Sequence, residues 1–220
     1  MKAFNTLCTL FSVLIMGMLI TSFYTGSDLH VGYVIPVKMS VFYVGVDNPV
    51  WISACKMKDD QIMPVISNGS ISRTAAPGSY VVRINGGVDA IIDIMTNDST
   101  QTLGSYKFRI KRIPDPVAYV GNLKADGIMS GIELQNISGI FARMENFDFD
   151  VKFNVVSFEM SLFSKGKWKT LFATGPAFTP EMKADIATVV DKDKVLFSKV
   201  IVKGPDGTLR KIPGVIIDVK

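Results

Sequence analysis

Two carboxylates alternate with two aromatic residues at positions 147–150, and this segment is the clearest candidate for acid or metal chemistry in the chain. On a strand, alternate side chains share one face, so Asp148 and Asp150 would lie side by side. Such a pair can bind a cation or supply an acid and a base. The spacing of an EF-hand is absent, and no second acidic cluster converges on the pair in sequence. We therefore expect Phe147 and Phe149 to pack inward, with the carboxylates facing solvent or paired with lysines.

The supply of nucleophiles and metal ligands argues against catalysis. The 220 residues include one histidine, His30, and two cysteines, Cys8 and Cys55. Neither a His/Cys metal cluster nor a His-based triad can be assembled from so few residues. The Asn-Gly-Gly turn at 85–87 lacks the lysine and the strand–loop–helix context of a phosphate-binding loop. We predict that the protein is not an enzyme and holds no metal or cofactor.

Two tryptophans and a basic row are the candidate binding groups. Trp51 and Trp168 could stack on a sugar ring, but each lies in a strand pattern, so packing in a core is the first expectation. Basic side chains recur along 106–113, at Lys107, Arg109, Lys111 and Arg112. This row either faces a partner or is a solvated strand face. The net formal charge of +4 is too small to indicate a nucleic-acid-binding surface.

The first 27 residues have the layout of an export signal. Lys2 is followed by an uncharged run from Ala3 to Ser27, and the centre of this run at 7–20 is strongly apolar. The run is also long enough to span a bilayer, so an uncleaved membrane anchor is the alternative to a cleaved signal peptide. Under both interpretations the rest of the chain lies on the exported side of the membrane.

Residues 33–105 are predicted to form one β-sandwich domain. Short β-branched and aromatic runs alternate with turn residues, and no helical period separates them. The expected strands are 38–44, 50–55, 62–67, 79–84 and 89–95. Pro49 requires extended backbone before it, and Asn-Gly pairs supply the positive φ of tight reversals between strands.

Residues 106–220 are predicted to form a second β-sandwich with one or two short helices. The half-buried strand 106–113 is expected to open it, which places the boundary at 104–106. A capping box at Ser130 and Glu133 predicts one helix, and Thr179-Pro180 predicts a second helix with an apolar face. The other expected strands are 149–163, 167–172, 195–203 and 210–219. The predicted fold class is all-β, with two tandem Ig-like sandwiches after the signal or anchor segment 1–27.

Five blocks of sequence resemble, in order, the C-terminal half of the gliding-motility family GldM and its counterpart PorM, of the type IX secretion system in Bacteroidetes. The blocks are 43–49, 68–71, 107–116, 145–151 and 204–211. The family-motif and candidate partner-binding residues within them are Asp47, Asn48, Pro49, Arg109, Lys111, Arg112, Pro114, Asp115, Pro116, Asn146, Asp148, Asp150, Pro205 and Asp206. Together these blocks span most of the chain after the leader.

The resemblance implies the last two periplasmic domains of that family, with 33–105 similar to the third domain and 106–220 similar to the C-terminal domain. In the family these domains form a dimeric shaft, which contacts a ring of outer-membrane lipoproteins at its distal end and couples to an inner-membrane motor at the other. The two preceding family domains and the charged cytoplasmic start are not found in this sequence. We therefore expect binding to ring or other envelope proteins, and the sequence leaves open whether any coupling to the motor remains.

The combined prediction is a periplasmic, homodimeric, non-enzymatic structural or adaptor protein of the secretion and gliding machinery. It has no nucleic-acid partner, and its membrane contact is limited to an N-terminal anchor. The alternative is an exported β-sandwich module that binds carbohydrates or surfaces.

Overall fold

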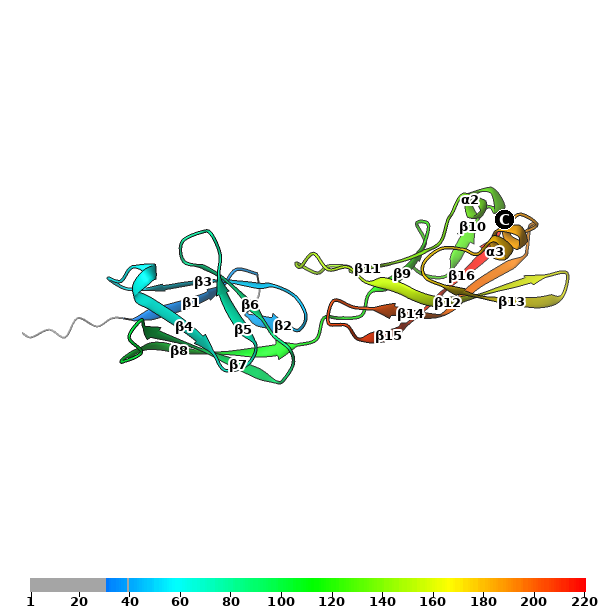
Figure 1. The fold of residues 1–220 in the computed structure, drawn as a ribbon. Coiled ribbons are helices and arrows are strands. Elements are labelled where there is room, and N and C mark those ends of the chain that lie inside the picture. Colours follow the sequence, from blue (N-terminus) through cyan, green and yellow to red (C-terminus); the bar gives the residue numbers. More distant parts are fainter. Residues whose placement is uncertain (1–30, 39) are drawn as a thin grey trace, which may run out of the picture.

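Regular alternation of apolar and polar residues builds the first domain as two facing four-stranded sheets. The computed structural model describes residues 31–38 and 40–220, and the two sheets run β1-β3-β6-β5 and β2-β8-β7-β4 (Figure 1). Every second residue of β3 is buried, because one face of the strand lies on the core. The strands are β1 (Gly32–Pro36), β2 (Val41–Tyr43), β3 (Asn48–Ala54), β4 (Ile62–Ile66), β5 (Ser70–Arg73), β6 (Ser79–Arg83), β7 (Asp89–Thr96) and β8 (Thr102–Lys111). The expected leader, 1–27, lies outside the described residues.

The predicted domain boundary at 104–106 is wrong. The strand that was expected to open the second domain is the C-terminal part of β8, which pairs antiparallel with β7 and parallel with β2. Phe108 of this strand stacks on Phe42 in the first core, with ring centroids 4.5 Å apart. Alternation identifies a half-buried strand, but it carries no information about which sheet the strand joins. The first domain therefore ends at Lys111.

The second domain packs a large sheet against a small sheet and two helices. The large sheet runs β10-β16-β14-β12-β13, with β15 also paired to β14, and the small sheet pairs β9 with β11. Side chains from the small sheet and both helices share one buried core with the large sheet, so they cover its inner face (Figure 1). The elements are β9 (Val117–Val120), β10 (Gly127–Met129), α2 (Gly131–Gln135), β11 (Ile140–Arg143), β12 (Asn154–Ser164), β13 (Lys167–Thr174), α3 (Pro180–Ile186), β14 (Lys194–Lys203), β15 (Leu209–Ile212) and β16 (Val215–Val219). The predicted fold class is confirmed.

Both predicted helices begin at their expected caps. The Glu133 amide donates to the Ser130 hydroxyl at 3.2 Å, and the Ser130 amide donates to the Glu133 carboxylate at 2.9 Å, which completes the capping box of α2. At α3 the Met182 amide donates to the Thr179 hydroxyl at 3.2 Å. Met182 and Ile186 are buried on the inner face of α3. Among the described residues, no helix has the length and apolarity that crossing a membrane requires.

Two of the expected strands of the second domain differ from those observed. The strand predicted from residue 149 begins only at Asn154, and 149–153 is irregular chain before β12. The stretch 210–219 is divided into β15 and β16 at Pro213-Gly214. A Cβ on Gly214 would lie 1.8 Å from the carbonyl oxygen of Phe197, so the backbone passes too close to β14 for any side chain there.

β2 contributes to the packing of both domains. Successive side chains of a strand point to opposite faces. Phe42 therefore points into the first core, while Val41 and Tyr43 belong to the buried cluster of the second domain. This short strand places the contact between the two domains at the end of the first sandwich.

Candidate functional site at the domain junction

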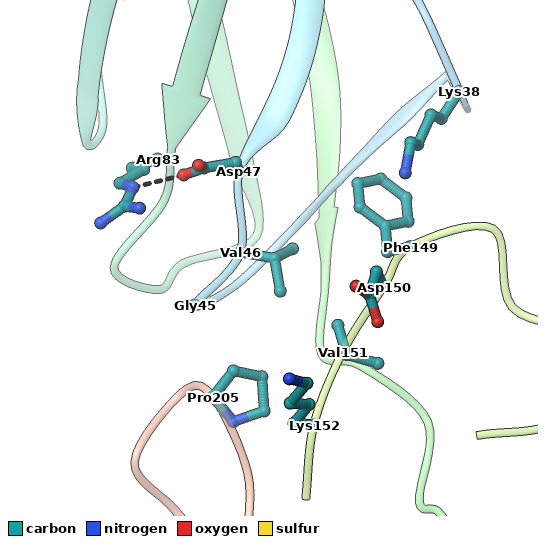
Figure 2. Close-up of a pocket in the computed structure, with 10 residues that line it drawn as sticks. All are labelled: Lys38, Gly45, Val46, Asp47, Arg83, Phe149, Asp150, Val151, Lys152 and Pro205. Atoms are coloured by element: carbon teal, nitrogen blue, oxygen red, sulfur yellow. Dashed lines mark hydrogen bonds and ion pairs between the residues drawn. The ribbon is translucent and has the colours of Figure 1, made fainter. Parts of the chain in front are cut away.

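An aromatic cluster joins the two domains. Tyr43, which is only 5% exposed, lies against two rings from the loop between β11 and β12. Its ring centroid is 4.9 Å from that of Phe147 and 5.4 Å from that of Phe149, both in edge-to-face geometry. The Lys38 ammonium lies over the Phe149 ring, 4.6 Å from its centroid (Figure 2). It also donates to the backbone carbonyl of Asp148 at 2.8 Å. Apolar burial thus holds this loop of the second domain on the first domain.

A buried arginine fixes the chain segment that connects the domains. Arg210 on β15 is 8% exposed, and its guanidinium donates to the carbonyl oxygens of Ile113 at 2.6 Å and Pro114 at 3.3 Å. It also forms ion pairs with Asp115 at 3.1 Å and Asp206 at 2.6 Å. Arginine suits this role because its planar fork can donate to several acceptors at once. The linker is therefore attached to the second domain along its length.

The turn at 204–207 approaches the first domain so closely that only glycine fits opposite it. A Cβ on Gly45 would lie 2.5 Å from the Cα of Asp206, and Gly45 has a φ of +81°, in the left-handed region. The turn itself is closed by a hydrogen bond from the Gly207 amide to the Gly204 carbonyl at 3.0 Å. Arg112 donates to the Thr208 hydroxyl at 3.2 Å, which adds a second contact from the end of the first domain.

The carboxylate of Asp206 is held in its charged form. Its side chain is 3% exposed, and burial by itself raises the pKa. The Thr208 hydroxyl and amide, at 2.8 and 3.1 Å, and the Arg210 guanidinium all donate to the carboxylate. These bonds outweigh burial, so the pKa of Asp206 lies below its ordinary value of 3.8.

The Asp-Asn-Pro motif shapes the neighbouring loop of the first domain. The Asn48 side chain is buried, and its amide oxygen accepts from the Tyr43 amide at 2.8 Å. Its amide nitrogen donates to the carbonyls of Tyr43 at 2.9 Å and Val82 at 3.2 Å. Asp47 forms an ion pair with Arg83 on the surface. Asn48 thereby fixes the loop that carries Gly45 and the strand that carries Tyr43.

An open cleft of about 440 Å³ lies between the domains beside these contacts (Figure 2). Its lining residues are Lys38, Gly45, Val46, Asp47, Arg83, Phe149, Asp150, Val151, Lys152 and Pro205. The cleft combines apolar walls with charges of both signs. It contains neither a nucleophile next to a base nor a set of metal ligands, and no metal-binding cluster of His, Cys, Asp or Glu occurs within 31–38 and 40–220. This lining suits contact with another chain segment better than chemistry.

The junction brings together most of the residues that the sequence singled out. The first domain supplies Asp47 and Asn48, the linker supplies Arg112, Pro114 and Asp115, and the second domain supplies Asp148, Asp150, Pro205 and Asp206. Pro49, Pro116 and Asn146 are neighbours of these residues in the chain. Asp148 and Asp150 lie in a loop and not on a strand, but they are exposed while Phe149 is buried, as expected. Arg109 and Lys111 are exposed on β8, away from the cluster around Arg210.

Several residues that build the junction were missed by sequence reasoning, chiefly Arg210, Tyr43, Gly45 and Lys38. The first three lie within blocks that carry the family resemblance, so the blocks contained the signal. Their roles were not deducible, because nothing local indicates that position 210 contacts position 113.

Two family matches divide the chain at this junction. The GldM third domain matches residues 32–111, and the GldM C-terminal domain matches residues 114–220. The chain belongs to the GldM family. The resemblance predicted from the five blocks is thus confirmed, and the buried linker around Ile113 is the border between two GldM domains. These are domains of a component of gliding motility and type IX secretion, and they are not a known enzyme family.

Solved structures align with this GldM-family chain only weakly. The fibronectin(III)-like modules of CbhA from Clostridium thermocellum are 14% identical with a TM-score of 0.27, covering 86% of this chain and 94% of theirs. The adhesin InvE of Yersinia pseudotuberculosis is 11% identical with a TM-score of 0.30, covering 84% and 58%. SGBP-B of the Bacteroides ovatus mixed-linkage glucan utilization locus, solved in complex with a heptasaccharide, is 9% identical with a TM-score of 0.22, covering 82% and 43%. No curated protein matches the chain.

Both tryptophans lie on the surface, which corrects the expectation that they pack in cores. Trp51 on β3 is 46% exposed and Trp168 on β13 is 57% exposed. Trp51 belongs to the outward face of β3, whose other face is buried, whereas β13 around Trp168 is exposed on both faces and has only Ala173 buried. The strand pattern was correct, but which face of the strand is buried was not deducible from an isolated aromatic residue.

Replacing Arg210 with alanine is expected to loosen the junction of this GldM-family chain. The change leaves the buried Asp206 carboxylate without its positive partner and the linker carbonyls without their donor. Removing one partner of a buried ion pair costs about 3–5 kcal/mol. Urea unfolding should show the loss, and small-angle X-ray scattering should show a broader range of interdomain orientations. Lys211→Ala, at an exposed neighbour on β15, is the matched control. Equal stability and scattering for both variants would contradict the role given to Arg210.

The junction is also expected to weaken in acid. Because the pKa of Asp206 is lower in the folded chain than the ordinary value of 3.8, its contribution to stability is fully present above that value. The contribution is lost as the pH falls below 3.8 and through the folded-state pKa. Melting temperatures measured between about pH 6 and pH 2 should therefore fall less steeply for Asp206→Asn than for the unmodified chain. Asp148→Asn, at an exposed junction carboxylate, serves as control, and parallel curves for all three proteins would refute the assignment.

Proposed function

We propose that this chain is a non-enzymatic, periplasmic structural or adaptor protein of the type IX secretion and gliding machinery. The observation that carries the proposal is the junction, where a buried arginine and an aromatic cluster connect the two domains through polar and apolar contacts. Domains within a chain ordinarily move relative to one another unless their interface is large and apolar. A protein that links envelope partners at a fixed separation needs such an interface, whereas a loosely tethered binding module does not.

A second feature supports self-association of the chain. The outward face of β1 and β3 exposes four large apolar residues, namely Tyr33, Ile35, Val37 and Trp51, at 46–60%. Ile35 lies directly across the strand pair from Trp51, so these side chains form a continuous patch. Exposed apolar patches of this kind mark interaction sites. We propose that this β1/β3 face is where two copies form a homodimer.

The edge of β1 does not offer an alternative route to association. Pro36 has no amide hydrogen to donate, and the Tyr106 hydroxyl already donates to the Gly32 carbonyl at 2.6 Å. Pairing of β1 with a strand of another copy is therefore blocked at both of its ends. Two copies can still associate through the side chains of the β1/β3 face.

Cross-linking in envelope fractions tests the adaptor proposal. We expect the full chain, purified after mild cross-linking, to retain outer-membrane-associated lipoproteins of the secretion ring. Arg210→Ala should reduce the recovery if partners contact both domains at once, while Lys211→Ala should leave it unchanged. Recovery of no envelope protein from cells that express the secretion machinery would contradict the proposal.

Light scattering coupled to size exclusion tests the homodimer. Ile35→Asp and Trp51→Asp place a charge in the β1/β3 face, so each should convert a dimer into a monomer. Val65→Asp is the matched control, because Val65 is a similarly exposed apolar residue on β4 of the opposite sheet. A mass that is monomeric in the unmodified chain, or dimeric in every variant, would refute this interface.

The exposure of both tryptophans is one observation in favour of the carbohydrate-binding alternative. The surroundings of Trp51 argue against this alternative. Its cross-strand neighbours are Ile35 and Ser79, and only Ser79 has a polar side chain. Sugar sites combine stacking with several hydrogen-bonding groups. We expect no tryptophan-dependent signal on a glycan array, and a signal that Trp51→Ala or Trp168→Ala abolishes would favour this alternative.

A further inference from the structure

The hairpin between β12 and β13 projects from the end of the second domain that lies away from the first domain (Figure 1). Ser164 pairs with Lys167, so the hairpin closes through the two residues Lys165 and Gly166. Both have positive φ, at +50° and +78°, as a tight turn of this kind requires. We refer to residues 163–168 as the hairpin tip.

An aromatic pair lies on one face of the hairpin tip. Trp168 is 57% exposed, and its ring centroid is 5.1 Å from that of the half-buried Phe163, its cross-strand partner. Phe172 lies on the same face of β13, four residues after Trp168, and it is 60% exposed. This face of β13 therefore presents two large exposed aromatic side chains to its surroundings.

Two lysines next to the hairpin tip are neutralised by carboxylates, whereas the two lysines of the tip itself are not. Lys169 is neutralised by Asp185 at 2.8 Å, and Lys194 is neutralised by Asp218 at 2.7 Å. Lys165 and Lys167 are exposed, and no carboxylate of the described part of the chain lies within ion-pair distance of either. Two uncompensated positive charges thus lie just before the exposed tryptophan in the chain.

We propose that the hairpin tip binds the surface of an anionic lipid bilayer. Tryptophan concentrates at membrane–water interfaces because its large ring is apolar while its indole N–H remains hydrated. Lysines next to it are attracted by anionic headgroups, and their long stems let the charge stay at headgroup level. A tight hairpin can present both kinds of side chain to a bilayer without disturbing the sheet behind it.

The shape of the tip favours a lipid surface over a protein partner. Stable protein–protein interfaces bury about 800 Å² on each partner and centre on well-packed pockets. The tip is a narrow projection of six residues, and it presents side chains outward on a turn without forming a groove. A bilayer interface accepts single inserted side chains and needs no complementary pocket. This contact would be independent of the N-terminal anchor and of the partners proposed above.

Intrinsic fluorescence of the full chain can isolate the tip. The sequence has two tryptophans, so Trp51→Phe leaves Trp168 as the sole reporter, and Trp168→Phe leaves Trp51. Each reporter senses its own surroundings, so membrane contact by any other part of the chain does not imitate the signal. We expect vesicles of phosphatidylethanolamine and phosphatidylglycerol to shift the Trp168 emission to the blue, with quenching by brominated lipids. The Trp51 emission should not change.

Charge variants test the lipid chemistry in the Trp51→Phe background. Lys165→Gln and Lys167→Gln should each weaken binding to the anionic vesicles about fivefold. This factor corresponds to the ~1 kcal/mol that one lysine contributes near such a surface, since ~1.4 kcal/mol is a tenfold change in affinity. Lys203→Gln and Lys211→Gln, at exposed lysines elsewhere in the domain, are matched controls and should have little effect. Equal shifts on phosphatidylcholine vesicles, equal effects of all four lysine variants, or no shift with any vesicle would overturn the proposal. Tip-dependent capture of an acidic protein without any vesicle signal would also overturn it, in favour of a protein partner.

Discussion

The architecture of the junction depends on one buried guanidinium. Taking Arg210 out of water is costly unless every donor finds an acceptor, and the protein supplies two carbonyls and two carboxylates. Because those acceptors come from the linker and from the turn at 204–207, satisfying Arg210 fixes both segments together. The close approach of Gly45 to Asp206 then follows, since it requires the turn to stay where Arg210 holds it.

The same constraint explains why β2 can serve two domains. Phe42 stacks on Phe108 in the first core, while Val41 and Tyr43 are buried among residues of the second domain. If the linker were mobile, Tyr43 would be exposed to water for part of the time and its burial would stabilise little. With the linker attached to Arg210, the aromatic contacts with Phe147 and Phe149 persist and add their own apolar burial. Ionic and apolar contacts therefore support each other here.

Local features of this chain could be predicted from the sequence, and long-range ones could not. The caps at Ser130 and Thr179 act within one helical turn, and both were identified correctly. The strand ending at Lys111 was also recognised, yet its assignment to the second domain was wrong because pairing with β7 and β2 leaves no local trace. Likewise, Asp206 and Asp47 were singled out only through family blocks. Their convergence depends on Arg210, which contacts linker residues about a hundred positions away in the chain.

Stiffness at the junction also determines how contacts at distant surfaces act on one another. The β1/β3 face belongs to the first domain, and the hairpin tip lies at the far end of the second. If the two domains moved freely, binding at the tip would leave the orientation of the β1/β3 face undetermined, and each further contact would incur its own ordering cost. With Arg210 and Tyr43 in place, one contact already orients the whole molecule, so a second is effectively intramolecular. The linking role proposed above would therefore depend on the buried junction more than on any single surface.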